Sequence, residues 1–223
     1  MKIGVRLSAH FTDTGDYLAD ARALDAAGVD TLWLPDDGFD PWLVLAGIAA
    51  VTGRARLAVP VAARDAIPAD ALARRLTTLD RLSRGRVLMT VVPALEPAET
   101  EALIGRARGG GAGPLLLHAD GGGHAVVGAR LADGLVASLE PARCHAAFDQ
   151  ARVRRERDRL TTPFELWTQG PAPDGREPWR ALLAAAEAVG ATGVIVPADP
   201  RLLDLLRNAD EEEDRSDLTL AQG

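Results

Sequence analysis

The chain has 223 residues, 47% of them hydrophobic and 26% charged, which is typical of a globular protein rather than a disordered one. Its net charge of −7 and the lack of any basic cluster interleaved with aromatics argue against nucleic acid as a partner. A single cysteine, Cys144, excludes an internal disulfide. No cleavable signal follows the first methionine, and no apolar run approaches the roughly 20 residues of a membrane helix. We therefore expect a cytoplasmic protein without a membrane partner.

Short apolar runs alternate with longer segments along nearly the whole chain. The predicted strands, in chain order, are Lys2–Ser8, Thr31–Pro35, Arg56–Val61, Arg86–Val92, Pro114–His118, Gly134–Leu139, Phe164–Thr168 and Gly193–Pro197. They are continuous apolar runs rather than alternations, which is typical of parallel strands covered on both faces.

The longer segments have the periodicity of amphipathic helices. Apolar residues recur at helical spacing in three sets, Tyr17, Ala21, Leu24 and Ala27, then Leu72, Leu76, Leu79 and Leu82, then Trp179, Leu182, Leu183 and Ala186. Gly28 and Gly190 are predicted to end two helices in the left-handed conformation. Each helix would lay one apolar stripe on the sheet.

Eight strand-and-helix units in about 210 residues predict a compact α/β fold, the (β/α)8 TIM barrel, with short loops. A weak internal repeat supports this prediction, because ALDAAGVDTLWLPDD and AAAEAVGATGVIVPAD share one order of helix, glycine, strand, proline and acid. An open doubly wound sheet is the alternative. Residues 1–208 are expected to form one domain, and the acidic residues 209–223 a disordered tail.

In such a barrel, the ligand site lies where the strands end at their carboxyl termini. The candidates at these positions are His10, Asp36, Asp37, Arg64, Asp65, His118, Asp120, Gln169 and Asp199. His10 and His118 could act as general bases, although a surface-loop histidine is the preferred interpretation of each taken singly. Asp36 and Asp37 could orient a polar substrate, but an acid just after a strand is also the usual N-cap of the next helix, which Asp40 and Pro41 would then start, and capping is the preferred interpretation.

A glycine-rich turn follows the fifth predicted strand. Gly121, Gly122 and Gly123 precede a helix whose free N–H groups could hold a phosphate, and a simple flexible turn is the alternative. The run Gly109–Gly113 precedes a strand and is interpreted as a flexible connection. The sequence contains no zinc, Walker or serine-hydrolase motif, so metal sites have no support from the pattern.

Several ordered segments resemble the bacterial luciferase-like monooxygenase family. These are MKIGV, ALDAAGVDTLWLPDD, DPWLVLAGIAAVTGRARLAVPV, TLDRLSRGRV, PLLLHADGGGHAVVGARLADGLV and ATGVIVPADPRLLDLLRN. Members are barrel enzymes that use FMN or a deazaflavin coenzyme. The run TLDRLSRGRV carries the most specific part of the resemblance.

The resemblance implies a coenzyme that lies across the rim, with its phosphate near Gly121, Gly122 and Gly123. Its ring would lie over the early strand ends, at Asp36 and Val61. His10, Asp37 and His118 are then the catalytic candidates, a small organic molecule is the expected substrate, and a homodimer through helices beside the early strands is expected.

Three departures from the family pattern bear on this expectation. Asp37 stands where deazaflavin-dependent members carry a histidine, and Val91 to Ala94 replace a glycine-rich segment after the fourth strand. The insertion that helps to cover the site is reduced to Glu96–Gly113.

Two main hypotheses follow. The first is a flavin- or deazaflavin-dependent oxidoreductase, either a monooxygenase or a hydride-transfer enzyme. The second is a non-catalytic homologue that keeps the barrel as a binding or assembly module. A third hypothesis, a barrel enzyme of another class such as a phosphosugar isomerase, rests only on fold analogy and on an anion-binding turn.

Overall fold

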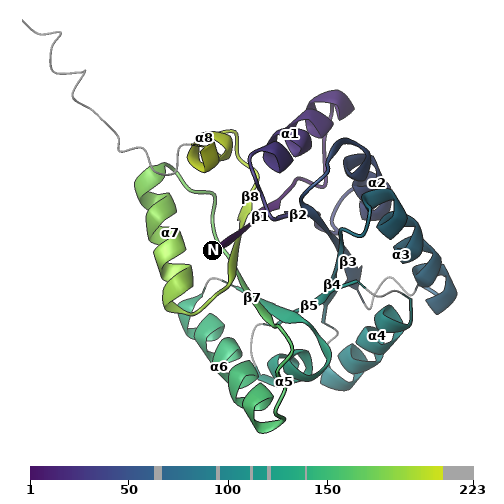
Figure 1. Cartoon of the computed structure of the whole chain (residues 1–223), viewed down its shortest axis with the longest axis vertical. Helices are drawn as coiled ribbons and strands as arrows, with labels where there is room; N and C mark the ends of the chain where they lie inside the picture. The colour runs from purple at the N-terminus through teal and green to yellow at the C-terminus, as the bar shows by residue number, and fades with distance from the viewer. Residues whose placement is uncertain (63–66, 94–95, 111–112, 120–121, 139, 208–223) are drawn as a thin grey trace, which may run out of the picture.

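The computed structural model describes residues 1–62, 67–93, 96–110, 113–119, 122–138 and 140–207, and within them eight strands alternate with eight helices (Figure 1). The strands are β1 (Lys2–Arg6), β2 (Thr31–Trp33), β3 (Arg56–Ala62), β4 (Val87–Val92), β5 (Leu115–His118), β6 (Gly134–Ala137), β7 (Glu165–Gln169) and β8 (Gly193–Pro197). The helices are α1 (Thr14–Ala26), α2 (Pro41–Val51), α3 (Ala69–Ser83), α4 (Pro97–Gly110), α5 (Gly122–Leu131), α6 (Pro141–Arg157), α7 (Arg176–Ala188) and α8 (Leu202–Arg207).

The strands close into a barrel in which each pairs in parallel with its neighbour in the chain. Closure is made by β8 and β1, whose register runs from Lys2 opposite Gly193 to Arg6 opposite Pro197. Helices surround the strands as an outer ring (Figure 1). The predicted (β/α)8 barrel is confirmed, and the open doubly wound sheet is excluded.

The interior of the barrel contains one layer of side chains of different sizes, contributed by seven of the eight strands. One buried cluster takes a residue from each of β2 to β8, namely Trp33, Ala58, Leu88, Leu116, Val136, Trp167 and Ile195. In β1 the corresponding residue is Gly4, where an added Cβ would lie 2.4 Å from the indole nitrogen of Trp33. Gly193 similarly faces Trp167, at 2.5 Å. Both tryptophans therefore depend on a glycine in a neighbouring strand.

The helix starts and ends predicted at Asp40, Pro41, Gly28 and Gly190 are confirmed, whereas Asp36 and Asp37 do not cap α2. Asp40 accepts hydrogen bonds from the N–H groups of Trp42 and Leu43, and Pro41 is the first residue of α2. Gly28 and Gly190 have φ angles of +89° and +73° after α1 and α7. The two glycines therefore allow the sharp turns from helix to strand.

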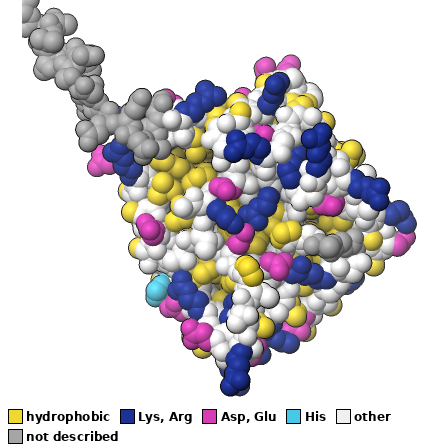
Figure 2. Space-filling model, viewed as in Figure 1, with side chains coloured by type: hydrophobic (Ala, Val, Ile, Leu, Met, Phe, Trp, Pro, Cys, Tyr) yellow, Lys and Arg dark blue, Asp and Glu magenta, His cyan; other side chains and the backbone are white. Residues whose placement is uncertain are grey.

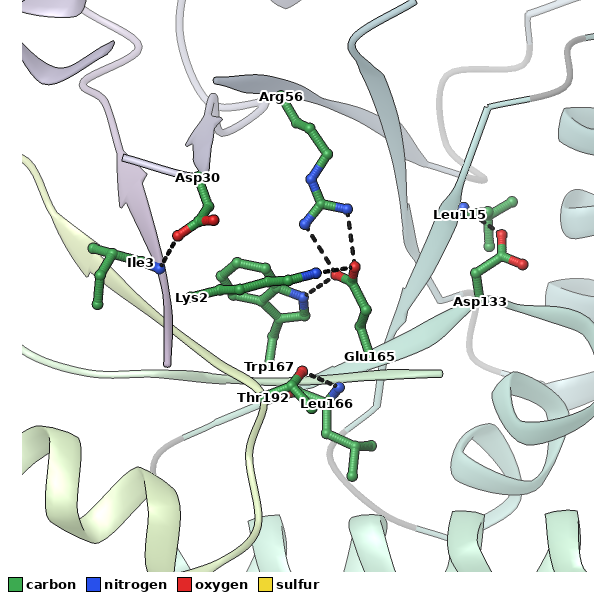
Figure 3. Close-up of polar contacts among 10 residues, drawn as sticks. All are labelled: Lys2, Ile3, Asp30, Arg56, Leu115, Asp133, Glu165, Leu166, Trp167 and Thr192. Carbon is green, nitrogen blue, oxygen red and sulfur yellow. Dashed lines mark hydrogen bonds and ion pairs between the residues drawn. The ribbon is translucent and has the colours of Figure 1, made fainter. Parts of the chain in front are cut away.

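Three side chains at the amino end of the barrel, the end where the strands begin, lie just before β2, β6 and β8 and join each of these strands to the strand before it (Figure 3). Asp30 accepts from the N–H of Ile3 at 2.7 Å. Asp133 accepts from Leu115 at 2.8 Å, and Thr192 from Leu166 at 2.9 Å. Asp30 and Thr192 occupy equivalent places in the internal repeat, so the repeat encodes a shared contact.

A charged cluster crosses the interior at the same end (Figure 3). The carboxylate of Glu165 accepts from Lys2 Nζ at 2.6 Å, from Arg56 Nη1 and Nη2 at 3.1 and 3.0 Å, and from Trp167 Nε1 at 2.7 Å. Burial alone would raise the pKa of Glu165, but hydrogen bonds from Arg56, Lys2 and Trp167 outweigh it and lower this pKa from 4.5 to about 2. The cluster thus joins β1, β3 and β7.

Some predictions differ from the structure or lie outside it. The run Gly109–Gly113 is not simply a flexible connection, because α4 continues through Gly109 and Gly110. The reduced segment Glu96–Gly113 thus carries an ordinary barrel helix. The predicted tail, residues 209–223, lies outside the described residues. Within the described part of the chain, every helix is too short or too polar to cross a membrane.

We predict that Glu165→Gln lowers the free energy of unfolding at pH 7 by about 2–3 kcal/mol, because Lys2 and Arg56 lose their shared anion inside the barrel. Since the folded pKa of Glu165 lies below the unfolded one, its contribution is present above pH 4.5 and is lost as the pH falls toward 2. Urea unfolding at pH 7, 4 and 3 measures both effects.

The control is Asp70→Asn, which breaks an ion pair with Arg74 whose side chains are 71% and 72% exposed, and we expect a change below about 0.5 kcal/mol. Equal stability of Glu165→Gln and the unmodified protein would contradict the role given to this cluster.

Candidate functional site

A cavity of about 260 Å³ opens at the carboxyl end of the barrel, the end where the strands finish. Its polar lining consists of Arg6, Asp36, Asp37, Thr90, His118 and Gln169. These residues come from four strands, β1, β4, β5 and β7, and from the loop after β2. Ligand sites of (β/α)8 barrels lie at this end, so this cavity is the candidate functional site.

Strand alternation explains why these side chains reach the cavity. Arg6, His118 and Gln169 each stand two residues beyond an inward position, those of Gly4, Leu116 and Trp167. Because side chains alternate between the faces of a strand, residues two apart point the same way. The polar groups therefore form a layer directly above the apolar interior cluster.

The floor of the cavity is apolar and aromatic. Trp33, only 5% exposed, lines it together with Pro60 and Ile195. The Trp33 ring meets the His118 ring edge-on, with centroids 6.4 Å apart, and the Trp167 ring lies 5.7 Å away on the inner side. The Trp33 indole nitrogen is buried and has no hydrogen-bond partner among the described residues. A flat apolar molecule with polar edges matches this combination of floor and rim.

His10 lies outside the cavity lining and joins two rim loops. Its Nε2 lies 3.0 Å from the carbonyl oxygen of Asp37, and the Phe39 N–H donates to the Ala9 carbonyl at 3.0 Å. Because a carbonyl can only accept, Nε2 of His10 carries the proton in this contact. We call this pair of contacts the His10 clip. It fixes the backbone of the loop that carries Asp36 and Asp37.

Aromatic rings support the His10 clip from the outside. Phe11 stacks on Tyr17 with centroids 4.3 Å apart and meets Phe39 at 5.0 Å. The Tyr17 hydroxyl donates to the Ser8 carbonyl at 2.9 Å, and burial raises the pKa of Tyr17 to about 12. Tyr17 therefore stays protonated at neutral pH and keeps the first loop in place.

The glycine-rich turn after β5 is partly described. Gly121 lies outside the described residues, while Gly122 begins α5 with a φ of +61° and has open space where a Cβ would be. At Gly123 a Cβ would lie 2.8 Å from Pro97, so that side is closed. Nε2 of His124, in the first turn of α5, is buried without a partner in the described part of the chain. A ligand oxygen can therefore approach this helix start at Gly122.

The remaining predicted residues fall in different places. Val61 is 2% exposed and packs in the cluster between strands and helices, outside the cavity lining, because it points away from the side that Pro60 faces. Arg64, Asp65 and Asp120 lie outside the described residues. Asp199 accepts from Arg201, which lowers the pKa of Asp199 to about 2, and the helix after it begins only at Leu202.

Sequence reasoning missed the inward residues below the strand ends. Arg6, Trp33, Pro60 and Thr90 line the cavity but were not among the predicted site residues. Alternate residues of a strand face inward, so counting in steps of two from Gly4 in β1 or from Pro60 in β3 could have found them. In a continuous apolar run, this count needs at least one residue that is known to face inward.

The residues at this end fit a flavin-type ring on chemical grounds. Trp33, Pro60 and Ile195 offer an apolar surface, and His118, Gln169 and Thr90 offer polar groups at its edge. The cavity encloses only part of such a ring, because its volume is smaller than the roughly 300–1,000 Å³ common for small-molecule pockets. Val92 is 37% exposed and lines the same cavity, so a side chain occupies the place expected for glycine.

Comparison with known proteins points to one family. The model of the family described as luciferase-like monooxygenase matches residues 1–112. A stretch of 62 residues is 45% identical to an uncharacterized protein of Mycobacterium tuberculosis, and it covers 26% of this chain and 22% of that protein. The chain therefore matches less than a quarter of the length of this relative.

Solved structures show the same fold. The coenzyme F420 dependent tetrahydromethanopterin reductase from Methanopyrus kandleri has a TM-score of 0.76 at 10% identity, over 92% of this chain and 96% of that one. An F420-dependent secondary alcohol dehydrogenase in complex with an F420-acetone adduct has a TM-score of 0.75 at 12% identity, over 93% and 96%. Monooxygenase RslO1 from Streptomyces bottropensis has a TM-score of 0.67 at 17% identity, over 93% and 97%.

We predict that Gly38→Ala opens the His10 clip, because a Cβ at Gly38 would lie 2.4 Å from the Ala9 carbonyl oxygen. Hydrogen exchange at Phe39 should rise at least tenfold, and the free energy of unfolding should fall by about 1–3 kcal/mol. The matched control is Gly53→Ala, where a Cβ meets nothing within 4 Å. Unchanged exchange at Phe39 in Gly38→Ala would show that the two loops are not held together by this contact.

Proposed function

Because the chain belongs to the luciferase-like monooxygenase family, we propose that its barrel binds FMN or a deazaflavin coenzyme across the carboxyl-end cavity and acts there as an oxidoreductase on a small organic substrate. This family comprises F420- and FMN-dependent oxidoreductases and monooxygenases. The observation that carries the proposal is the apolar floor of Trp33, Pro60 and Ile195 beneath a polar rim, at the end of the barrel where such sites lie.

Two features of the rim support particular contacts. The open start of α5 at Gly122 suits the coenzyme phosphate, since free N–H groups and the helix dipole favour an anion there. Nε2 of His124, which has no partner among the described residues, lies in the same turn and would gain one. The ring would rest on Trp33, with Gln169 and Thr90 near its edge. When bound, such a coenzyme supplies hydride transfer.

His118 is the residue that we propose to hold or move a proton. It is half-buried, it ends β5, and it lines the cavity beside Trp33. Histidine is the side chain whose ordinary pKa suits proton transfer near pH 7. Asp37 also lines the cavity and is proposed to orient the substrate, while His10 acts through the position of the Asp37 backbone.

The second candidate, a non-catalytic homologue that keeps the barrel as a binding module, is favoured by one observation. The cavity is small, and Val92 narrows it where the resemblance implies glycine. Both candidates predict a bound small molecule, so turnover of a reduced coenzyme separates them.

We propose no nucleic-acid partner, in keeping with the charges of both signs that are interspersed on the face seen in Figure 2. The cytoplasmic location also stays a prediction.

For the homodimer, the supporting observation is a groove between α2 and α3 that contains Leu43 and Leu82, which are 74% and 52% exposed. Large exposed aliphatic side chains side by side are typical of an interface, and the occupant we propose is a second copy.

We predict that Leu43→Glu converts this dimer to a monomer, because a charge replaces an apolar contact repeated by symmetry. Sedimentation velocity measures the change, and Val153→Glu, another exposed aliphatic position at 65%, is the control on α6. A monomer in the unmodified protein would contradict the homodimer.

We predict that fluorescence titration of the apo-protein with FMN and with deazaflavin coenzyme shows saturable binding of at least one. Gly122→Asn should weaken that binding roughly tenfold, because the new side chain blocks the phosphate approach at the start of α5. The control is Gly85→Asn, since Gly85 has a similar φ of +80° and similar open space but lies before β4 at the amino end. Absence of binding for both coenzymes would contradict the proposed function.

A further inference from the structure

Two arginines, Arg56 and Arg6, lie at opposite ends of the barrel, and they differ in whether their guanidinium groups have partners. Arg56, at the amino end, donates to Glu165 at 3.0 and 3.1 Å. Arg6, at the carboxyl end of β1, lines the cavity, and its guanidinium has neither a hydrogen bond nor an ion pair within the described residues. Among the described residues, the guanidinium of Arg56 is therefore paired and that of Arg6 is not.

The surroundings of Arg6 favour an anion as its partner. A guanidinium keeps its charge at any physiological pH and presents a planar fork of donors that matches a carboxylate or a phosphate. Arg6 is exposed, whereas Trp33 and Ile195 in the same cavity are nearly fully buried, so the part of a bound molecule that lies on these two residues would be removed from water. A charge-assisted hydrogen bond is roughly twice as strong as one between neutral groups.

Arg6 and the start of α5 lie on opposite sides of the mouth. In the closed order of strands, β5 is four strands from β1 in either direction. A coenzyme phosphate at Gly122 would therefore be held by β5 and α5, while Arg6 faces the mouth from β1. The start of α5 and Arg6 are therefore placed to bind two different anionic groups.

We infer that the substrate carries a carboxylate or phosphate group and that Arg6 binds this group at the β1 side of the cavity. The assignment of the anion to the substrate rests on the proposed function, which places the coenzyme phosphate at Gly122. Asp36 and Asp37 line the same cavity and repel a second anionic group, so the geometry favours a molecule with one anion, directed toward β1.

The experiment uses the apo-protein and three small aromatic probes, benzoate, benzamide and phenyl phosphate, measured by calorimetry. The ring of each probe suits the Trp33 floor, and benzamide is the neutral match of benzoate. We expect benzoate or phenyl phosphate to bind roughly 10- to 100-fold more tightly than benzamide, the range expected for a charge-assisted contact.

Arg6→Gln should abolish this preference, and Arg6→Lys should restore part of it. Arg22→Gln, an exposed arginine on α1 outside the cavity lining, should leave the preference unchanged. Asp37→Asn should strengthen benzoate binding by a few-fold, because a like charge is removed. Equal affinities for the three probes, no binding of any of them at millimolar concentration, or a preference that survives in Arg6→Gln would overturn the inference.

A second arm identifies the source of the anion. FMN and riboflavin, which lacks the phosphate, are titrated into the unmodified protein and Arg6→Gln. We expect Arg6→Gln to bind both flavins as the unmodified protein does. A loss of about tenfold for FMN alone would assign Arg6 to the coenzyme phosphate and overturn the assignment to the substrate. If neither flavin nor deazaflavin binds while the Arg6-dependent preference persists, the proposed function fails and the anion site stands.

Discussion

The shared carboxylate of Glu165 is the interaction on which the barrel most depends at its amino end. One side chain from β7 accepts from Lys2 of β1 and Arg56 of β3 inside a closed ring. An unpaired charge is costly in a partly buried place, so these contacts favour the register that brings the three groups together. Asp30, Asp133 and Thr192 add hydrogen bonds between adjacent strands at the same end. The amino end is therefore fixed by side chains as well as by the backbone.

This arrangement leaves the carboxyl end free for binding. Above the interior cluster, the inward positions carry Arg6, His118 and Gln169, and the Arg6 guanidinium has no partner in the part of the chain that the structure describes. A barrel can support such groups because its stability comes from the opposite end and from the apolar layers between. Stability and ligand recognition are thus divided along the barrel axis.

The sequence predicted the order and type of the elements well, because both depend on local signals. Gly193–Pro197 matches β8 residue for residue, and Asp40 with Pro41 begins α2 as the pattern indicates. The direction of side chains could not be predicted, because a continuous apolar run does not show which alternate residues face the inside of the barrel. Val61 was expected near the ring but packs outward, while its neighbour Pro60 lines the cavity. A shift of one residue along a strand reverses the face.

The room for the aromatic floor also depends on residues far apart in sequence. Trp33 lies against Gly4 of β1, and Trp167 against Gly193 of β8, so each ring occupies the volume that a Cβ would fill. Sequence alone indicates a glycine and a tryptophan, but the register between strands decides that they meet. Asp37 replaces the histidine implied by the family pattern, and His118 lines the same cavity from β5. A histidine therefore remains at the mouth of this barrel, at the end of β5.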